Sequence, residues 1–216
     1  MHNIVKNLIY IEELIKSKVN HDKLTQIIAV SKTFPIKNIL PLIEHGHLHY
    51  GENKVQEALD KWSDIKLKVN SIKLHLIGKL QTNKVKFALK IFDYIHSLDG
   101  EKLAIKISQE QVKQEKKPKI FIQVNIGNED QKSGINKERL GDFYKFCKDL
   151  NLDVIGTMCI PPNDGNVEKY FSEMNKINQE LNFKELSMGM SGDYLEAVKN
   201  NATYVRVGSK IFGNRA

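Results

Sequence analysis

The chain has 216 residues, of which 41% are hydrophobic and 27% are charged. This composition provides enough apolar side chains for a core and excludes an intrinsically disordered protein. No apolar run approaches the roughly 18 residues that a membrane span needs, and the N-terminus lacks the apolar segment and cleavage site of a signal peptide. We therefore expect a soluble, cytoplasmic protein that forms one domain over residues 1–216 and does not bind membranes.

The net charge of +7 arises from 33 basic and 26 acidic residues, and only three of the basic residues are arginines. Arginine is the side chain that best reads bases and clamps phosphates, so the excess of lysine favours a solvated surface over nucleic-acid binding. The two cysteines, Cys147 and Cys159, have the spacing of neither a redox motif nor a disulfide scaffold.

The predicted elements begin with an amphipathic helix over Val5–Ile15, in which apolar residues recur at helical spacing. Eight short apolar runs follow, each of a length typical of a buried parallel strand: 27–30, 49–51, 74–78, 94–97, 120–124, 154–158, 186–189 and 204–208. Helical patterns separate them, at 36–44, 55–65, 83–92, 103–112, 136–150, 167–181 and 194–200. Asn136 and Asp193 are the expected N-caps of two of these helices.

Eight strands that alternate with helices predict a (β/α)8 barrel with an additional N-terminal helix. The alternative is an open, doubly wound sheet. In a barrel the active site lies at the C-terminal ends of the strands, so the residues that follow each apolar run are the candidate functional residues.

Two of these residues follow the first and second strands. Lys32 comes directly after the first run, where partial burial would lower its pKa and make the amine a nucleophile for aldehydes. Its alternative interpretation is a solvated loop lysine. Asn53 follows the second run and offers a donor and an acceptor to a ligand, unless it caps the next helix.

The seventh and eighth strands are followed by residues suited to phosphate. Ser191 and Gly192 follow one strand, and Gly208 and Ser209 follow the other. In barrels these two loops often form a phosphate site from hydroxyls and backbone N–H groups. Arg206 lies within the last strand, where a cation needs a ligand or a polar partner. A nucleophilic lysine, a phosphate site and this arginine suit a phosphorylated aldehyde, of which pyridoxal 5′-phosphate (PLP) is the natural candidate.

Several motifs also occur in a familiar order: Ala29-Val30-Ser31-Lys32, Gly51-Glu52-Asn53, His75-Leu76-Ile77-Gly78, Lys132-Ser133-Gly134, Ile160-Pro161-Pro162, Leu186-Ser187-Met188-Gly189-Met190-Ser191 and Val205-Arg206-Val207-Gly208-Ser209. With them the sequence resembles the YggS/PROSC family of PLP homeostasis proteins over almost its whole length. Each motif alone is weak evidence for the family, but the whole set in this order is specific to it. The departures are Lys54 where an aromatic residue is common, Ser209 in place of threonine, and Gly192 in place of aspartate or alanine.

The resemblance implies a single barrel similar to the N-terminal domain of alanine racemase. It implies that Lys32 holds PLP as a Schiff base and that Arg206 faces the pyridine nitrogen. Asn53 and Met188 would line the ring. The phosphate would be held by four residues of the last two loops: Ser191, Gly192, Gly208 and Ser209.

The resemblance also implies a PLP-binding protein that buffers or delivers the cofactor, with no established catalysis. Apo forms of PLP-dependent enzymes are the candidate recipients. Related racemases carry a second, β-rich domain that supplies a catalytic tyrosine, whereas this chain ends at Ala216, shortly after the eighth strand. We therefore expect an open site and a monomer. The alternatives are a weak amino-acid racemase or another PLP-dependent enzyme, and an RNA- or protein-binding barrel.

Three histidines alternate before the second strand, at His45, His47 and His49. Alternate residues of an extended segment share a face, so the alternative interpretation is a weak binding site for Zn²⁺ or Ni²⁺. No matching cysteines or carboxylates accompany these residues, and we expect no functional metal site. His75, in the third strand, is expected to be a hydrogen-bonded histidine of the barrel.

Overall fold

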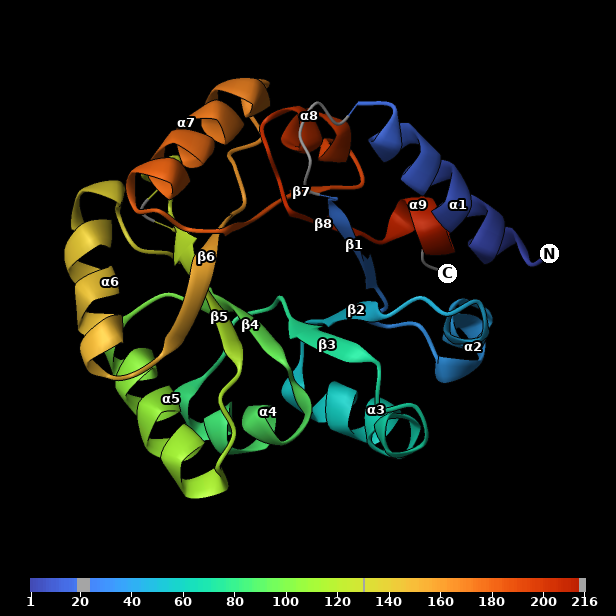
Figure 1. Cartoon of the computed structure of the whole chain (residues 1–216), viewed down its shortest axis with the longest axis horizontal. Helices are drawn as coiled ribbons and strands as arrows, with labels where there is room; N and C mark the ends of the chain where they lie inside the picture. Colours follow the sequence, from blue (N-terminus) through green and yellow to red (C-terminus); the bar gives the residue numbers. More distant parts are fainter. Residues whose placement is uncertain (19–23, 130, 214–216) are drawn as a thin grey trace.

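The computed structural model describes residues 1–18, 24–129 and 131–213. Its centre is a closed barrel of eight parallel strands in sequence order, each hydrogen-bonded to the next, with the last paired to the first (Figure 1). The strands are β1 (Gln26–Val30), β2 (His49–Glu52), β3 (Lys73–Leu76), β4 (Tyr94–Leu98), β5 (Lys119–Val124), β6 (Asp153–Cys159), β7 (Glu185–Met190) and β8 (Tyr204–Val207). The predicted barrel is confirmed, and the open sheet is excluded.

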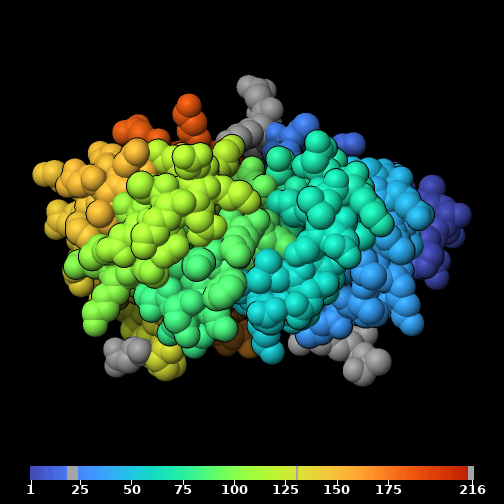
Figure 2. Space-filling model, turned by 90° about the horizontal axis from the view of Figure 1, so that it is seen from below, coloured from blue at the N-terminus to red at the C-terminus, as the bar shows by residue number. Residues whose placement is uncertain are grey.

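Helices surround the barrel as an outer layer (Figure 1). They are α1 (Asn3–Lys16), α2 (Ile36–Glu44), α3 (Val55–Lys68), α4 (Val85–Ile91), α5 (Glu101–Gln114), α6 (Leu140–Asp149), α7 (Val167–Glu180), α8 (Tyr194–Lys199) and α9 (Ser209–Phe212). Short 3₁₀ turns precede α4 and α6, at η1 (Thr82–Lys84) and η2 (Lys137–Arg139). Figure 2 shows one flank, where the part of the chain that includes α3, α4 and α5 covers the strands.

Alternation along the strands divides the buried side chains into two groups. Residues such as Ile27 and Ala29 of β1 pack against the helices in the larger apolar cluster. The neighbouring Ile28 points the other way and joins a smaller cluster inside the barrel with Tyr94, Phe121, Met158 and Tyr204. The same alternation decides which residues after each strand reach the inside of the barrel at its C-terminal end.

The last helix is fixed by the first one. α1 and α9 lie side by side (Figure 1), and the Asn7 side chain donates a hydrogen bond of 2.9 Å to the Ile211 carbonyl. Phe34, which follows β1, stacks on Phe212 with ring centroids 4.9 Å apart. The two ends of the described chain therefore meet beside the C-terminal end of β1. α9 is absent from the sequence-based prediction, because four residues are too few for a periodic pattern.

The predicted strand and helix positions agree with the structure to within a few residues. Two predicted N-caps do not act through their side chains: Asn136 and Asp193 occupy the N-cap positions of η2 and α8 without a capping hydrogen bond. None of the helices in the described part of the chain has the length and apolar character needed to cross a bilayer.

Candidate functional site

A cavity of about 540 Å³ opens at the C-terminal ends of the strands. Seven of the eight residues predicted for the site line it: Lys32, Asn53, Ser191, Gly192, Arg206, Gly208 and Ser209. Apolar side chains complete the wall: Val30, Phe34, Ile77, Ile160 and Met190. The cavity therefore combines an amine, a guanidinium, an amide and two hydroxyls with an apolar surface of the kind that holds a small ligand.

Met188 is not among the residues that line this cavity. Ser187 faces the inside of the barrel, where it contacts His96 and Arg206, so its neighbour Met188 faces outward and packs fully buried in the helix-side cluster. Strand alternation explains the difference. Met190, two residues further on, lines the cavity instead, because Gly189 with its φ of 88° and a register shift against β8 interrupt the alternation.

Lys32 lies in a tight turn between β1 and α2. Phe34 N–H donates to the Ser31 carbonyl at 3.1 Å, and Thr33 adopts a φ of 68°. This left-handed conformation is unusual for a β-branched residue and stores strain of about 1–3 kcal/mol. The Glu57 carboxylate accepts the Thr33 N–H at 2.7 Å and holds the turn. Lys32 is partly buried there and is directed into the cavity by a constrained backbone.

A buried carboxylate joins the ends of β1 and β2 beneath the site. Glu52 is fully buried, and its Oε1 accepts hydrogen bonds from Ser31 Oγ (2.8 Å), Lys61 Nζ (2.9 Å) and Trp62 Nε1 (2.9 Å). Lys61 Nζ also donates to the Ser31 carbonyl at 3.0 Å. These contacts connect the residues next to Lys32 and Asn53 to α3 behind them.

Asn53 is positioned by a close approach of the two segments that follow β2 and β3. A Cβ added to Gly78 would overlap the Asn53 carbonyl oxygen and lie 2.8 Å from its Cα. Glycine is therefore required at position 78. The N-cap position of α3 belongs to Lys54, so Asn53 is not the capping residue of that helix.

The loop after β7 is shaped by Asp193. Its carboxylate accepts the Met190 N–H at 2.6 Å, and its own N–H donates to the Met190 carbonyl at 3.1 Å. The two bonds close a turn that presents Ser191 and Gly192 to the cavity. Gly189 precedes this turn with a φ of 88°, and a Cβ there would lie 2.5 Å from that of Ala197, so β7 meets α8 directly.

The loops after β7 and β8 meet at the cavity. Ser191 Oγ accepts a hydrogen bond of 3.2 Å from Gly208 N–H, which links the two loops. Ser209 is exposed beside this contact and lines the same cavity. The structure therefore brings together the four residues that were predicted to form one site: Ser191, Gly192, Gly208 and Ser209.

Arg206 forms the deep part of the cavity and is only 4% exposed. Its guanidinium donates to Ser187 Oγ at 2.8 Å and to the Cys159 carbonyl at 2.9 Å. Within the part of the chain that the structure describes, no ion pair includes it. Burial lowers its pKa from the ordinary value, although an arginine keeps its proton. The site thus contains a cation held by neutral partners.

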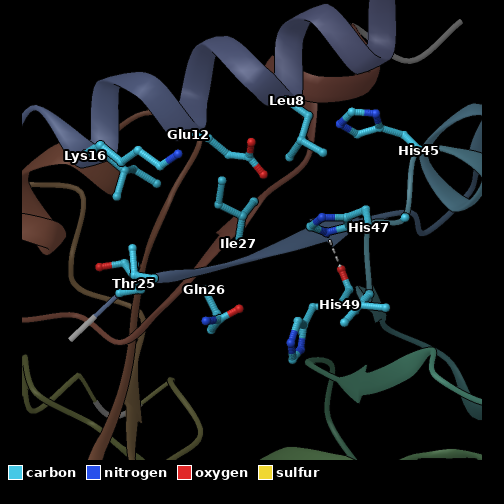
Figure 3. Close-up of a pocket in the computed structure, with 13 residues that line it drawn as sticks. Leu8, Glu12, Lys16, Thr25, Gln26, Ile27, His45, His47 and His49 are labelled. Atoms are coloured by element: carbon cyan, nitrogen blue, oxygen red, sulfur yellow. Dashed lines mark hydrogen bonds between the residues drawn. The ribbon is translucent and has the colours of Figure 1, made fainter.

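A second cavity, of about 360 Å³, lies beside the N-terminal end of β1, against α1 (Figure 3). His45, His47 and His49 line it, but their rings do not converge. His47 bonds to the His49 carbonyl at 2.9 Å, and the ring of His49 turns away from α1 and bonds to His75 at 2.9 Å. Among the described residues, no group of three or more His, Cys, Asp or Glu side chains is arranged to hold a metal ion.

Five residues that support this site were not among the predicted site residues: Thr33, Glu52, Lys61, Asp193 and the buried His96. One signal pointed to Glu52 and His96, because each interrupts an apolar strand pattern as Arg206 does. Thr33 and Asp193 carry no such signal, since a positive φ and a hydrogen bond across a loop depend on the folded backbone.

Comparison with known proteins places this arrangement in a family. Residues 7–216 match the sequence model of the alanine racemase N-terminal domain. The pyridoxal phosphate homeostasis protein of Aquifex aeolicus is 38% identical over 200 residues, covering 88% of this chain and 87% of the relative. The chain belongs to the family of pyridoxal phosphate homeostasis proteins. The family member from Escherichia coli K12 is 30% identical over 230 residues, covering all of this chain and 98% of the relative.

Solved structures agree with the family assignment. PipY of Synechococcus elongatus, in a structure with PLP bound, has a TM-score of 0.86 and 31% identity, covering 97% of this chain and all of the other. Alanine racemase from Acinetobacter baumannii has a TM-score of 0.77 at 16% identity, over 99% of this chain and 61% of the racemase chain. At that identity the racemase shares the fold alone with this member of the homeostasis family.

Proposed function

We propose that this protein binds pyridoxal 5′-phosphate through Lys32 and serves intracellular PLP homeostasis by buffering or delivering the cofactor. The observation that carries the proposal is the convergence of Lys32, Arg206 and the hydroxyls of two adjacent loops on one cavity. The PLP bound in the solved PipY structure and the names of the curated relatives support the same conclusion.

The cavity suits this ligand in size and chemistry. Its volume of about 540 Å³ lies within the ordinary range for small-molecule sites. The side chains of Val30, Ile77 and Ile160 offer an apolar surface to a flat ring, and the polar residues lie at separate places around it. The donors suit a phosphorylated aldehyde better than a metal ion, because an ammonium and a guanidinium carry positive charge and offer no lone pair to a cation.

The aldehyde of bound PLP supplies reversible condensation with a primary amine, which forms a C=N bond and releases one water. Lys32 provides the amine, and the strained turn at Thr33 fixes where it enters the cavity. Ser191, Gly192, Gly208 and Ser209 are proposed to hold the phosphate through hydroxyl and N–H groups. Asn53 is proposed to contact the edge of the ring.

Arg206 is proposed to face the pyridine nitrogen and to keep it unprotonated. A guanidinium is always charged, and a fixed positive charge disfavours a second one beside it. Without a protonated nitrogen the ring is a weaker acceptor of electrons, so the site favours holding the cofactor over turning over amino acids. An arginine at this place does not by itself exclude catalysis, but together with the homeostasis role for which the curated relatives are named it supports a carrier over a racemase.

The direct test is a visible absorption spectrum of the purified protein incubated with PLP, beside the variant Lys32→Ala. Lys54→Ala is the matched control, because Lys54 is an exposed neighbour of Asn53 that does not line the cavity. We expect the band of lysine-bound cofactor in the wild type and in Lys54→Ala, and its loss in Lys32→Ala. Borohydride reduction followed by peptide mapping should place the label on Lys32.

The carrier and enzyme interpretations separate in a second assay. Exchange of the Cα hydrogen of amino acids, followed by NMR in deuterated water, should be negligible with the loaded protein. Turnover at ordinary enzymatic rates would overturn the carrier assignment. No band in any variant would overturn PLP binding itself.

A further inference from the structure

A chain of buried polar side chains crosses the inside of the barrel from its N-terminal end to Arg206. Three histidines on neighbouring strands form it: His49 on β2, His75 on β3 and His96 on β4. His49 Nδ1 lies 2.9 Å from His75 Nε2, and His75 Nδ1 lies 2.9 Å from His96 Nε2. His96 Nδ1 lies 2.9 Å from Ser187 Oγ, which accepts the bond from Arg206. Five residues from five strands are thus in continuous contact.

Strand register explains how the histidines reach one another. His75 is level with Gly51 on β2, two residues beyond His49, and it is level with Tyr94 on β4, two residues before His96. Each histidine therefore lies one inward-facing position further along than the one before it. The chain climbs from the N-terminal end of the barrel toward the cavity at the C-terminal end.

The surroundings of the chain are apolar and aromatic. His75 stacks on Tyr94 with ring centroids 4.2 Å apart, and His96 stacks on Phe121 at 4.3 Å. Ser187 and both of these histidines are fully buried. A charged imidazole is costly in such a place, and burial lowers the pKa of His75 and of His96 well below 6.5. Both rings are therefore neutral at physiological pH.

The direction of the chain follows from Arg206, because a guanidinium only donates hydrogen bonds. Ser187 Oγ accepts from Arg206, so its own hydrogen is available for His96 Nδ1. His96 must then carry its hydrogen on Nε2 and donate to His75 Nδ1. By the same step His75 donates from Nε2 to His49 Nδ1. From Arg206 to His49 Nδ1, each acceptor in this order receives one hydrogen, and each ring turns its lone pair toward the cation.

The reverse order is less favourable on two counts. If His96 donated from Nδ1 to Ser187, the buried serine hydroxyl would be left without an acceptor among its described contacts. Each ring would also direct an N–H toward the positive charge of Arg206. Donation in the order Arg206, Ser187, His96, His75, His49 gives the serine hydroxyl an acceptor and points no ring N–H at the guanidinium.

We propose that Ser187, His96, His75 and His49 form a one-way hydrogen-bond chain that orients the Arg206 guanidinium and stabilises its charge without neutralising it. A carboxylate partner would neutralise the cation. Neutral dipoles leave its full positive charge to act on the group that it faces. The four residues are positioning residues for Arg206. Their effect, through Arg206, on the pyridine nitrogen of PLP rests on the proposed function. The existence and direction of the hydrogen-bond chain do not depend on that function.

The first test uses the wild-type protein without any cofactor, labelled with ¹⁵N in its histidine rings. Long-range ¹H–¹⁵N correlation near neutral pH reports which ring nitrogen carries hydrogen. His96 is identified by its contacts with the Phe121 ring, and His75 by its contacts with the Tyr94 ring. We expect the neutral Nε2–H form at His49, His75 and His96. An Nδ1–H form at His96, or a positive charge on any of the three, would overturn the proposal.

The second test breaks the chain at one atom. Ser187→Ala removes the hydroxyl between Arg206 and His96, and Thr157→Val is the control. Thr157 is equally buried, but its hydroxyl bonds outward to Asn178, so its loss spares the chain. In Ser187→Ala we expect a changed ¹⁵N shift of His96 Nδ1 and a changed spectrum of added PLP, with a dissociation constant several-fold higher.

Thr157→Val should leave the His96 signal and the cofactor spectrum as in the wild type. An unchanged His96 signal and an unchanged cofactor spectrum in Ser187→Ala would reject the positioning role. If Ser187→Ala fails to fold, the tautomers of the wild-type rings still decide the direction of the chain. If wild-type protein does not change the absorption spectrum of added PLP, the proposed function fails. The tautomers of the three histidine rings still test the hydrogen-bond chain, because they are measured without cofactor.

Discussion

Asp193 accepts a hydrogen bond from the backbone N–H of Met190, with 2.6 Å between that nitrogen and Oδ1. The bond spans the two residues between them, Ser191 and Gly192, which line the cavity. An aspartate at the start of a helix ordinarily caps the helix with its side chain. Here the carboxylate instead accepts a hydrogen bond from a residue that precedes it in the sequence, and this bond shapes the loop proposed to hold phosphate.

Asp193→Ala should weaken PLP binding about tenfold, since a hydrogen bond to a charged group contributes about 1.5–3 kcal/mol. Asp193→Asn keeps the acceptor oxygen and should bind within about twofold of the wild type. Titration by absorbance measures both constants. Pyridoxal, which lacks the phosphate, should bind all three proteins alike, and an equal loss for pyridoxal would contradict a role in the phosphate loop.

Lys61→Met should lower the free energy of unfolding by about 3 kcal/mol, because it leaves the buried Glu52 carboxylate without its cation. Lys66→Met is the matched control on the same helix. Lys66 pairs with Asp93 at 2.6 Å, but both partners are more exposed, so its loss should cost about 1 kcal/mol or less. Urea denaturation followed by circular dichroism compares them, and equal losses would argue against a special role for Glu52.

Gly78→Ala should destabilise the fold by about 3 kcal/mol, since the new Cβ meets the backbone of Asn53 and both segments are held by the strands that they directly follow. Displacement of Asn53 should also weaken PLP binding. Gly141→Ala, on the exposed face of α6 with nothing within 4 Å of its Cβ, should stabilise by up to about 1 kcal/mol. Thermal unfolding of the two variants gives opposite shifts of Tm, and a tolerated Gly78→Ala would contradict the close approach.

Acidification should destabilise the protein from about pH 6.5 downward. Burial lowers the pKa of His47 from 6.5 to about 4, and it lowers the pKa values of His49, His75 and His96 as well. Between the folded and unfolded pKa values, the unfolded chain binds protons that the folded chain does not. The free energy of unfolding therefore rises with pH in that window, by up to about 1.4 kcal/mol per pH unit for each histidine.

Urea midpoints near pH 5 and near pH 7.5 measure this dependence, with His45→Gln as the control because His45 is exposed. That control should keep the wild-type slope. His47→Gln should reduce it. A wild-type midpoint that stays constant over this range would show that the buried histidines take up protons in the folded protein as they do in the unfolded chain.

Much of this molecule was determined by local sequence pattern. Strand and helix lengths followed from apolar periodicity, because each strand must bury apolar residues and each helix must cover a strand. The position of Lys32 directly after β1 and of Arg206 within β8 placed both at the same end of the barrel as soon as a barrel was expected. The two loops with serine and glycine followed from the same rule.

Other features were decided only by tertiary structure. Met188 and Met190 would share a face of a regular strand, but only Met190 lines the cavity, because Gly189 with its positive φ and the irregular pairing with β8 interrupt the alternation between them. Asp193 is a standard capping residue by sequence, but the folded loop offers it a nearer partner. The contacts that link His49 to His75, His75 to His96 and His96 to Ser187 depend on how four strands are placed in the closed barrel, which no local pattern specifies. Sequence periodicity sets the elements, whereas closure of the barrel brings their polar residues within hydrogen-bonding distance.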